Sequence, residues 1–152
     1  MSAMPWLQPG DQLILDGADY TVSEIVIGRT DRLSFQLVEV RPSLGGESRR
    51  LLQLERRAFA VEPAGLDEMR GEEVSLAGRT LRRRWEDQVR TEVADAQGDR
   101  RFGLGRCAYY EGDDDSVGLR IEEGDQAYAL VGTLLDGSRL DLRFTESARK
   151  RR

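Results

Sequence analysis

The amino-acid sequence predicts an all-β fold, built from many short antiparallel strands that form a barrel or a sandwich. Short apolar runs recur about every 8–12 residues, and Gly, Asp and Pro separate them, which is typical of turns between strands. No long amphipathic helical pattern competes with these runs. The chain holds 16 glycines in 152 residues, a content that suits tight hairpins and bulges.

The first half of the chain opens with a hairpin signal. The run Leu13-Ile14-Leu15 stops at Asp16-Gly17, a dipeptide that favours a two-residue turn. Further along, Leu33, Phe35 and Leu37 alternate with polar residues, with the period of a half-buried strand. Other strands of this half are predicted over 20–27, 51–54 and 58–61.

The long polar stretch 81–94 admits two interpretations. Trp85, Val89 and Val93 are four residues apart, as on one face of a helix, whereas Val89, Thr91 and Val93 alternate, as on a strand. Gly and Asp bound the stretch and no N-terminal capping signal opens it, so a strand is favoured. Other strands of the second half are predicted over 74–76, 102–110, 119–121, 128–131 and 140–144.

An internal repeat is visible in the two halves. Residues 10–20 align without gaps with residues 71–81, and the shared pattern describes a strand, a Gly turn and a second strand. A true duplication predicts two similar SH3-like or small-barrel halves packed together; convergence of two hairpins on the same turn chemistry is the alternative. The predicted organisation is a lead over 1–7, a first β half over 8–63, a connector over 64–70, a second β half over 71–145 and a basic, disordered tail over 146–152.

Several of these features together resemble a known family. They are the hairpin from Gly10 to Val22, the strand Val74-x-Leu76-x-Gly78, Tyr109-Tyr110, Ile121-Glu122 and Gly132. In this order they resemble the bacterial domain-of-unknown-function family numbered 4178, over most of residues 8–140. The resemblance implies an all-β domain without catalytic residues to carry over, of a kind found near phage-shock-like and other membrane-stress genes.

Composition excludes several function classes. The chain has no His and one cysteine, Cys107, so Ser-His-Asp and Cys-His pairs, His-ligated metals and thiolate zinc sites are excluded. We therefore expect no catalytic constellation and no cofactor. The single cysteine, the absence of a signal peptide and the absence of a run of ~20 apolar residues predict a cytoplasmic protein. Lys150 is the sole lysine and Asn is missing, which indicates a GC-rich, bacterial genome.

The formal net charge of −5 opposes nucleic acid as a default partner, because an acidic protein gains little from counterion release. Basic residues nevertheless cluster in Arg82-Arg83-Arg84 and in the tail 149–152. That tail, or a protein partner, is the expected route to any peripheral membrane contact.

The candidate site residues are of two kinds. Arg82, Arg84 and Trp85 combine cations with an aromatic ring that can bind phosphates or stack on bases, and Tyr109 and Tyr110 are candidate aromatic anchors for a partner. Three consecutive carboxylates form a candidate Ca²⁺ or Mg²⁺ site: Asp113, Asp114 and Asp115. The simpler interpretation of these carboxylates is a solvated hairpin tip.

These observations predict a non-catalytic bacterial β domain that acts as a protein-binding or assembly module. Its expected partner is another protein or a second copy, joined through a sheet edge. One alternative is a small-ligand- or divalent-metal-binding enzyme accessory that uses Asp, Glu and Arg. The other alternative is an oligonucleotide-binding β-barrel.

Overall fold

A computed structural model describes residues 6–55, 57–76 and 78–143 of the chain. The first five residues and the predicted basic tail lie outside this part. The described residues form eleven strands and no helix, so the all-β prediction is confirmed. The strands are β1 (Gln12–Leu15), β2 (Ala18–Arg29), β3 (Ser34–Pro42), β4 (Arg49–Leu54), β5 (Arg57–Ala64), β6 (Glu73–Leu76), β7 (Arg79–Asp95), β8 (Arg100–Gly112), β9 (Ser116–Glu123), β10 (Gln126–Leu134) and β11 (Leu140–Arg143).

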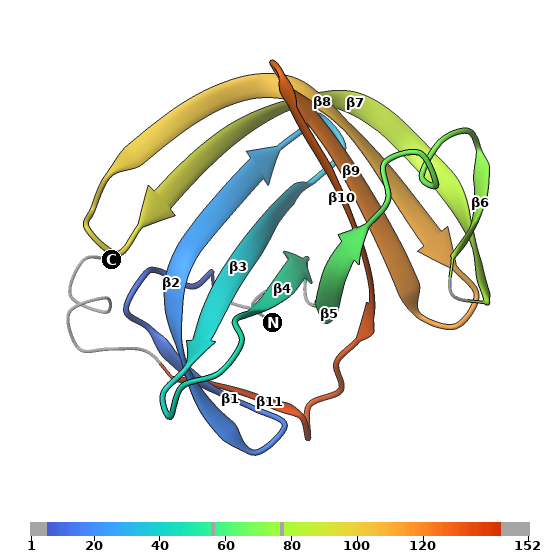
Figure 1. Cartoon of the computed structure of the whole chain (residues 1–152). Coiled ribbons are helices and arrows are strands. Elements are labelled where there is room, and N and C mark those ends of the chain that lie inside the picture. Colours follow the sequence, from blue (N-terminus) through green and yellow to red (C-terminus); the bar gives the residue numbers. More distant parts are fainter. Residues whose placement is uncertain (1–5, 56, 77, 144–152) are drawn as a thin grey trace.

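Eight of these strands form a closed antiparallel barrel (Figure 1). The order around the ring is β2-β3-β4-β5-β10-β9-β8-β7, and the pairing of β2 with β7 closes it. The remaining strands lie outside the ring, because β1 pairs with the beginning of β2 and with β11, and β6 pairs with the beginning of β7. The stretch whose period was ambiguous is a single strand of 17 residues, β7.

The two halves of the chain share this one barrel. Each half contributes four consecutive strands, β2–β5 and β7–β10, and neither closes a small barrel of its own. The two hairpins that the repeat predicted also correspond strand by strand. An offset of 61 residues carries Gln12–Leu15 onto Glu73–Leu76, and the start of β2 at Ala18 onto the start of β7 at Arg79.

Alternation along each strand separates an interior core from two exterior ones. Phe35 and Leu37 of β3 face the interior with residues such as Leu119 of β9. The next residue along β3, Val38, faces outward, where the β1–β2 hairpin covers it. A third cluster lies on the outside of the second half, where β6 packs with Met69 of the connector. Each external hairpin thus buries one outer face of the barrel.

Gly28 leaves room inside the barrel for the ring of Phe35 on the neighbouring strand. A Cβ atom at Gly28 would lie 2.2 Å from Cζ of Phe35, whose ring is fully buried. The two residues are directly paired between β2 and β3. Because a side chain at position 28 would occupy the space of the ring, only glycine accommodates Phe35 at this point.

A buried amide holds the N-terminal lead against the barrel. Gln36 of β3 points outward and is fully buried. Its side-chain nitrogen donates to the carbonyl oxygen of Leu7 (2.6 Å), and its side-chain oxygen accepts from the backbone N–H of Leu7 (2.9 Å). The pair satisfies both polar groups of the amide without water.

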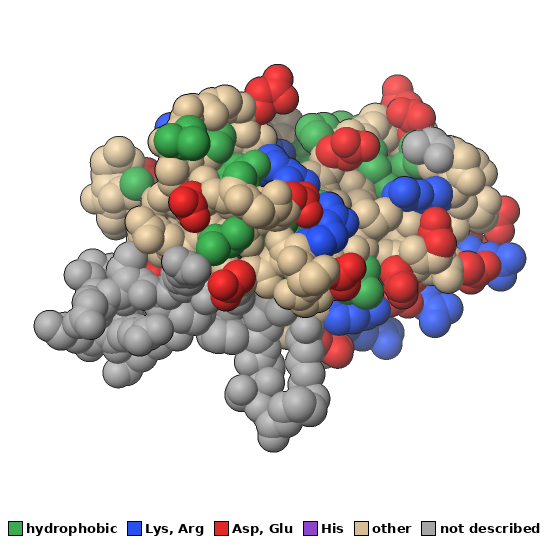
Figure 2. Space-filling model, turned by 90° about the horizontal axis from the view of Figure 1, so that it is seen from below, with side chains coloured by type: hydrophobic (Ala, Val, Ile, Leu, Met, Phe, Trp, Pro, Cys, Tyr) green, Lys and Arg blue, Asp and Glu red, His purple; other side chains and the backbone are tan. Residues whose placement is uncertain are grey.

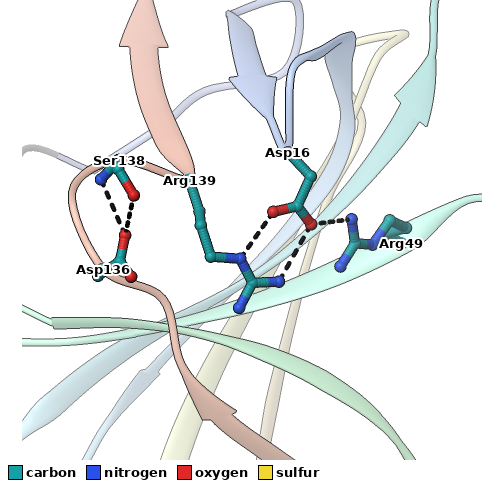
Figure 3. Close-up of polar contacts among 5 residues, drawn as sticks. All are labelled: Asp16, Arg49, Asp136, Ser138 and Arg139. Carbon is teal, nitrogen blue, oxygen red and sulfur yellow. Dashed lines mark hydrogen bonds and ion pairs between the residues drawn. The ribbon is translucent and has the colours of Figure 1, made fainter.

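One carboxylate joins three segments on the outside of the barrel (Figure 3). Asp16, in the β1–β2 turn, accepts hydrogen bonds from Nε and Nη2 of Arg139 (2.7 and 3.1 Å) and from Nη1 of Arg49 (3.0 Å). The hydrogen bonds from Arg139 first, and from Arg49 second, hold the pKa of Asp16 far below its ordinary value. The network therefore ties the chain before β11 and the start of β4 to the turn.

We expect Gly28→Ala to lower the free energy of unfolding by about 2 kcal/mol, because the added methyl group overpacks the interior against Phe35. Gly137→Ala is the control, since a Cβ there meets no atom within 4 Å, and its effect should stay within about 0.5 kcal/mol. Urea unfolding measures both. A double-mutant cycle with Phe35→Leu should show a compensating coupling; equal effects of the two glycine substitutions would contradict the predicted overlap.

We expect Asp16→Asn to destabilise the protein at pH 7 by up to about 1 kcal/mol, the range of partly exposed ion pairs. Asn tolerates the positive φ of 51° at this position, so the loss reports on charge. Because the carboxyl pKa is lowered in the folded state, the stabilisation is present above pH ~4 and is lost as the pH falls further. The stabilities of the two proteins should approach each other as the pH falls below 4 and become equal only below the lowered pKa of Asp16, whereas Asp31→Asn, in an exposed turn, should behave like the parent chain throughout.

Candidate functional site

The candidate site is a cavity of about 300 Å³ at one end of the barrel. Seven of the eight ring strands contribute to its lining, and β5 is the exception. The lining residues are Glu24, Val26, Leu37, Glu39, Arg50, Val93, Arg101, Phe102, Glu123, Gln126 and Tyr128. We refer to this space as the open-end cavity.

The opposite end of the barrel is filled with side chains. Trp85 and Tyr109 pack there with ring centroids 5.5 Å apart. Glu111 accepts hydrogen bonds from the Tyr109 hydroxyl (2.8 Å) and from Nε of Arg84 (2.9 Å), and it also pairs with Arg57 (3.7 Å). Two arginines and one aromatic hydroxyl thus neutralise and bind the carboxylate that faces this end.

The inner part of the open-end cavity is apolar and aromatic. Leu37 is buried and Val26, Val93 and Tyr128 are half-buried. Burial first, and the negative charge of nearby Glu123 second, raise the pKa of Tyr128 to about 12. The hydroxyl of Tyr128 is therefore a neutral hydrogen-bonding group at physiological pH.

The rim of the cavity carries charges of both signs. Glu39 accepts a hydrogen bond from the Ser23 hydroxyl (2.8 Å), and Glu24 is half-buried. Arg50 and Arg101 are exposed and make no ion pair with another described residue. The rim can therefore offer both hydrogen-bond acceptors and unpaired guanidinium groups to a polar molecule.

Glycine at position 103 makes room for one of the rim carboxylates. The Glu123 side chain lies across the inner face of β8, where a Cβ at Gly103 would coincide with its carboxylate oxygen. The Thr91 hydroxyl donates a hydrogen bond to the same carboxylate (2.9 Å). Gly103 leaves space for the Glu123 carboxylate on the inner face of the barrel, and the hydrogen bond from Thr91 holds it there.

The described residues contain no group of three or more Cys, Asp or Glu side chains that could hold a metal ion. The one thiol is also unsuited to nucleophilic chemistry. Cys107 is buried in the interior core, and burial first, then the charge of Asp87, raise its pKa to about 12. A thiol in this environment stays protonated and packs as a small apolar residue.

The predicted binding residues do not form one site. Arg82 is exposed and pairs with Glu73 (3.3 Å), whereas Arg84 belongs to the filled end of the barrel. Trp85 and Tyr109 pack in the interior core. Tyr110 faces the exterior core of the second half, and its hydroxyl donates to the carbonyl oxygen of Gly71 (2.9 Å).

The three predicted metal ligands lie in the turn between β8 and β9. All three side chains are exposed. Asp114 accepts a hydrogen bond from Ser116 (2.6 Å) and lies 3.6 Å from Arg79. Asp113, Asp114 and Asp115 therefore form a solvated hairpin tip and do not converge on a cation.

Sequence reasoning did not single out the residues of the open-end cavity. Glu24, Glu39 and Glu123 each look like one of 28 acidic residues. The β2–β3 pairing sets Glu24 opposite Glu39, and ring closure adds Glu123 at the same end. The pair Gly103 and Gly105 was the available signal. Two glycines on the same face of a strand indicate that something approaches that face closely.

Comparisons with known proteins add no relative. No protein-family model matches the chain, and neither the curated proteins nor the solved structures contain a significant match. The resemblance to the domain-of-unknown-function family therefore stays a prediction. In the described part of the chain, no helix is long and apolar enough to cross a membrane.

We expect the folded protein to resist tyrosine ionisation. Burial is the first cause of the raised pKa of Tyr109, Tyr110 and Tyr128, so absorbance at 295 nm should report incomplete ionisation of the four tyrosines at pH 11. Denaturant should release the others at that pH. Because the folded state holds these protons more tightly, stability should fall as the pH rises above ~10.

Tyr128→Phe tests the contribution of the open-end cavity to this titration. It should remove one tyrosine from the group that ionises on unfolding and leave the others unchanged. Native and denatured titration curves that coincide would show that the cavity and the cores are open to water.

Proposed function

We propose that this protein is a non-catalytic binding protein that holds one small, partly apolar molecule in the open-end cavity. One observation carries the proposal: seven ring strands converge on a cavity of about 300 Å³ that is apolar inside and charged at its rim. Closed barrels of eight strands are just wide enough to hold one small ligand. Ligand sites in general combine an apolar lining with a few convergent polar groups.

The charges at the rim suggest how a ligand would be oriented. Its apolar part would contact Val26, Leu37 and Tyr128, and a polar group would remain at the rim. Arg50 and Arg101 are free to bind an anionic group, because neither pairs with another described residue. A small aromatic or aliphatic anion is therefore a suitable first probe.

The oligonucleotide-binding alternative receives less support. Among the described residues on the face shown in Figure 2, arginines and acidic side chains are interspersed and form no continuous basic track. Arg82 and Arg84, which suggested that alternative, are paired with Glu73 and Glu111. Backbone tracking of a nucleic acid needs unpaired cations in a row.

We expect 1-anilinonaphthalene-8-sulfonate, an aromatic anion, to bind the folded protein saturably with a stoichiometry of one. Gln126→Trp should weaken this binding roughly tenfold, about 1.4 kcal/mol, because an indole would fill the mouth of the cavity. Ala127→Trp is the matched control, since Ala127 is also exposed but lies on the opposite face of β10. Fluorescence titration measures all three affinities.

Near-UV circular dichroism should confirm that both variants keep the native fold, because the same dye also binds partly unfolded proteins. Three outcomes would each refute the proposal that the cavity is the ligand site. They are binding that does not saturate, no binding of this dye or of a set of aromatic carboxylates, and equal effects of the two Trp substitutions.

A further inference from the structure

A β-bulge turns Glu24 into the open-end cavity. Val22 and Ile25 of β2 both pack in the exterior core that the β1–β2 hairpin covers, although they are three residues apart. Between them the register shifts, because Ser23 and Glu24 of β2 stand where β3 has only Glu39. Without the extra residue, Glu24 would share the outer face with Val22. Bulges often re-aim a side chain in this way beside a functional site.

The same bulge brings two carboxylates into register on neighbouring strands. Glu24 and Glu39 are directly opposite each other, and both line the cavity. Directly opposed residues have Cβ atoms about 5 Å apart, a distance at which like charges destabilise a strand pair. The Ser23 hydroxyl and Arg41 both contact Oε1 of Glu39 (2.8 and 3.8 Å). Glu24 has no such contact with another described residue, so the negative charge of the pair is only partly compensated.

An arginine continues the row on the next strand. Arg50 of β4 is paired in register with Glu39, so three adjacent strands present two carboxylates and then a guanidinium at the mouth of the cavity. Arg50 is exposed and forms no ion pair with a described residue, including the glutamate beside it. The row therefore offers an unmatched negative position next to an unmatched positive one.

The spacing of these charges indicates the class of ligand. No group of carboxylates in the described part of the chain is arranged to hold a metal ion, so the cation that fits here is an organic one. An ammonium group has three donors and can bind two carboxylates at once. A guanidinium group binds a carboxylate through two parallel hydrogen bonds. Because adjacent strands lie about 4.8 Å apart, one ligand can bind both positions if its ammonium and its carboxylate are attached to the same carbon.

The wall beneath the row provides for an apolar side chain. Val26 and Leu37 are paired directly between β2 and β3, two residues further into the barrel than the two glutamates. Tyr128 of β10 adds a half-buried aromatic ring to the same lining. A volume of about 300 Å³ is at the lower end of the range for ligand pockets. It suits a single amino acid better than a peptide or a nucleotide.

We propose that the open-end cavity binds a free α-amino acid that has a large apolar side chain. The ammonium group of the ligand would lie between Glu24 and Glu39, and its carboxylate would bind Arg50. Its side chain would contact Leu37 and Tyr128. This inference rests on the proposed function, because it needs the cavity to be a ligand site. It adds a cationic group to the ligand, since a simple anion would leave the two glutamates uncompensated.

Three small ligands that share a phenyl ring test the inference by isothermal titration calorimetry at pH 7. L-Phenylalanine carries both charges, 3-phenylpropionate carries only the carboxylate, and phenethylamine carries only the ammonium group. L-Phenylalanine should bind with a stoichiometry of one and at least roughly tenfold more tightly than either analogue, because each analogue leaves one side of the row unmatched.

Two charge-removing variants should separate the roles of the row. Glu24→Gln should weaken binding of L-phenylalanine and phenethylamine roughly fivefold or more, and 3-phenylpropionate should bind at least as well as before, because a repulsive charge is removed. Arg50→Gln should weaken binding of L-phenylalanine and 3-phenylpropionate and spare phenethylamine. Glu62→Gln and Arg90→Gln are the matched controls, since both positions are exposed on the outer face of the barrel, and all three affinities should stay unchanged. A merely structural defect would weaken all three ligands together.

Several outcomes would overturn the inference and leave the cavity as a ligand site. L-Phenylalanine that binds no more tightly than 3-phenylpropionate would assign the cavity to an anion, and equality with phenethylamine would assign it to a simple amine. Equal effects of Glu24→Gln on all three ligands would remove the role of the glutamates. The inference also fails if none of the three binds while the anilinonaphthalene dye still binds in a manner that Gln126→Trp weakens. If neither the dye nor any of the three binds, the proposed function fails with it.

Discussion

The pairing of β2 with β7 is the interaction on which the rest of the structure depends. It runs from Glu24 opposite Asp95 to Arg29 opposite Arg90, and it joins the two halves of the chain along one seam. Both strands are longer than the seam, so the beginning of β2 is left to pair with β1 and the beginning of β7 with β6. Closure therefore fixes one interior core inside the ring and, with the two external hairpins, one exterior core on each half.

The two ends of the barrel differ because of the residues that alternation turns inward there. At one end these are Trp85, Tyr109 and Glu111, which fill the space and bind each other and two arginines. At the other end they include three glutamates: Glu24 of β2 and Glu39 of β3, which are directly paired, and Glu123 of β9. Carboxylates in a barrel wall remain hydrated or hydrogen-bonded, since an uncompensated buried charge is costly. An end lined in this way cannot close over an apolar core, and a cavity results.

Much of the fold could be predicted from local signals. Asp16-Gly17 and the alternation of Leu33, Phe35 and Leu37 identify strands because turn chemistry and half-burial act over a few residues. The seam between 24–29 and 90–95 could not be predicted in this way, because it depends on pairing between distant segments. The same holds for part of the cavity: Glu24 and Glu39 are neighbours through the β2–β3 pairing, but only closure of the ring brings Glu123 of β9 to the same end. Arg82 and Arg84 were predicted as binding residues, but each is paired with a carboxylate. The local sequence does not reveal these partners, because one lies across a turn and the other is distant along the chain.

The unequal lengths of two hairpins give the open end its remaining property. β7 and β8 extend beyond β9 and β10, so the wall of the cavity and the unpaired edge of β8 are parts of the same segment. Phe102 lines the cavity and is also 75% exposed on the outer face of β8, and Arg101 beside it faces inward at the rim. The overhang of the β7–β8 hairpin therefore shapes both the wall of the cavity and the exposed surface beside it.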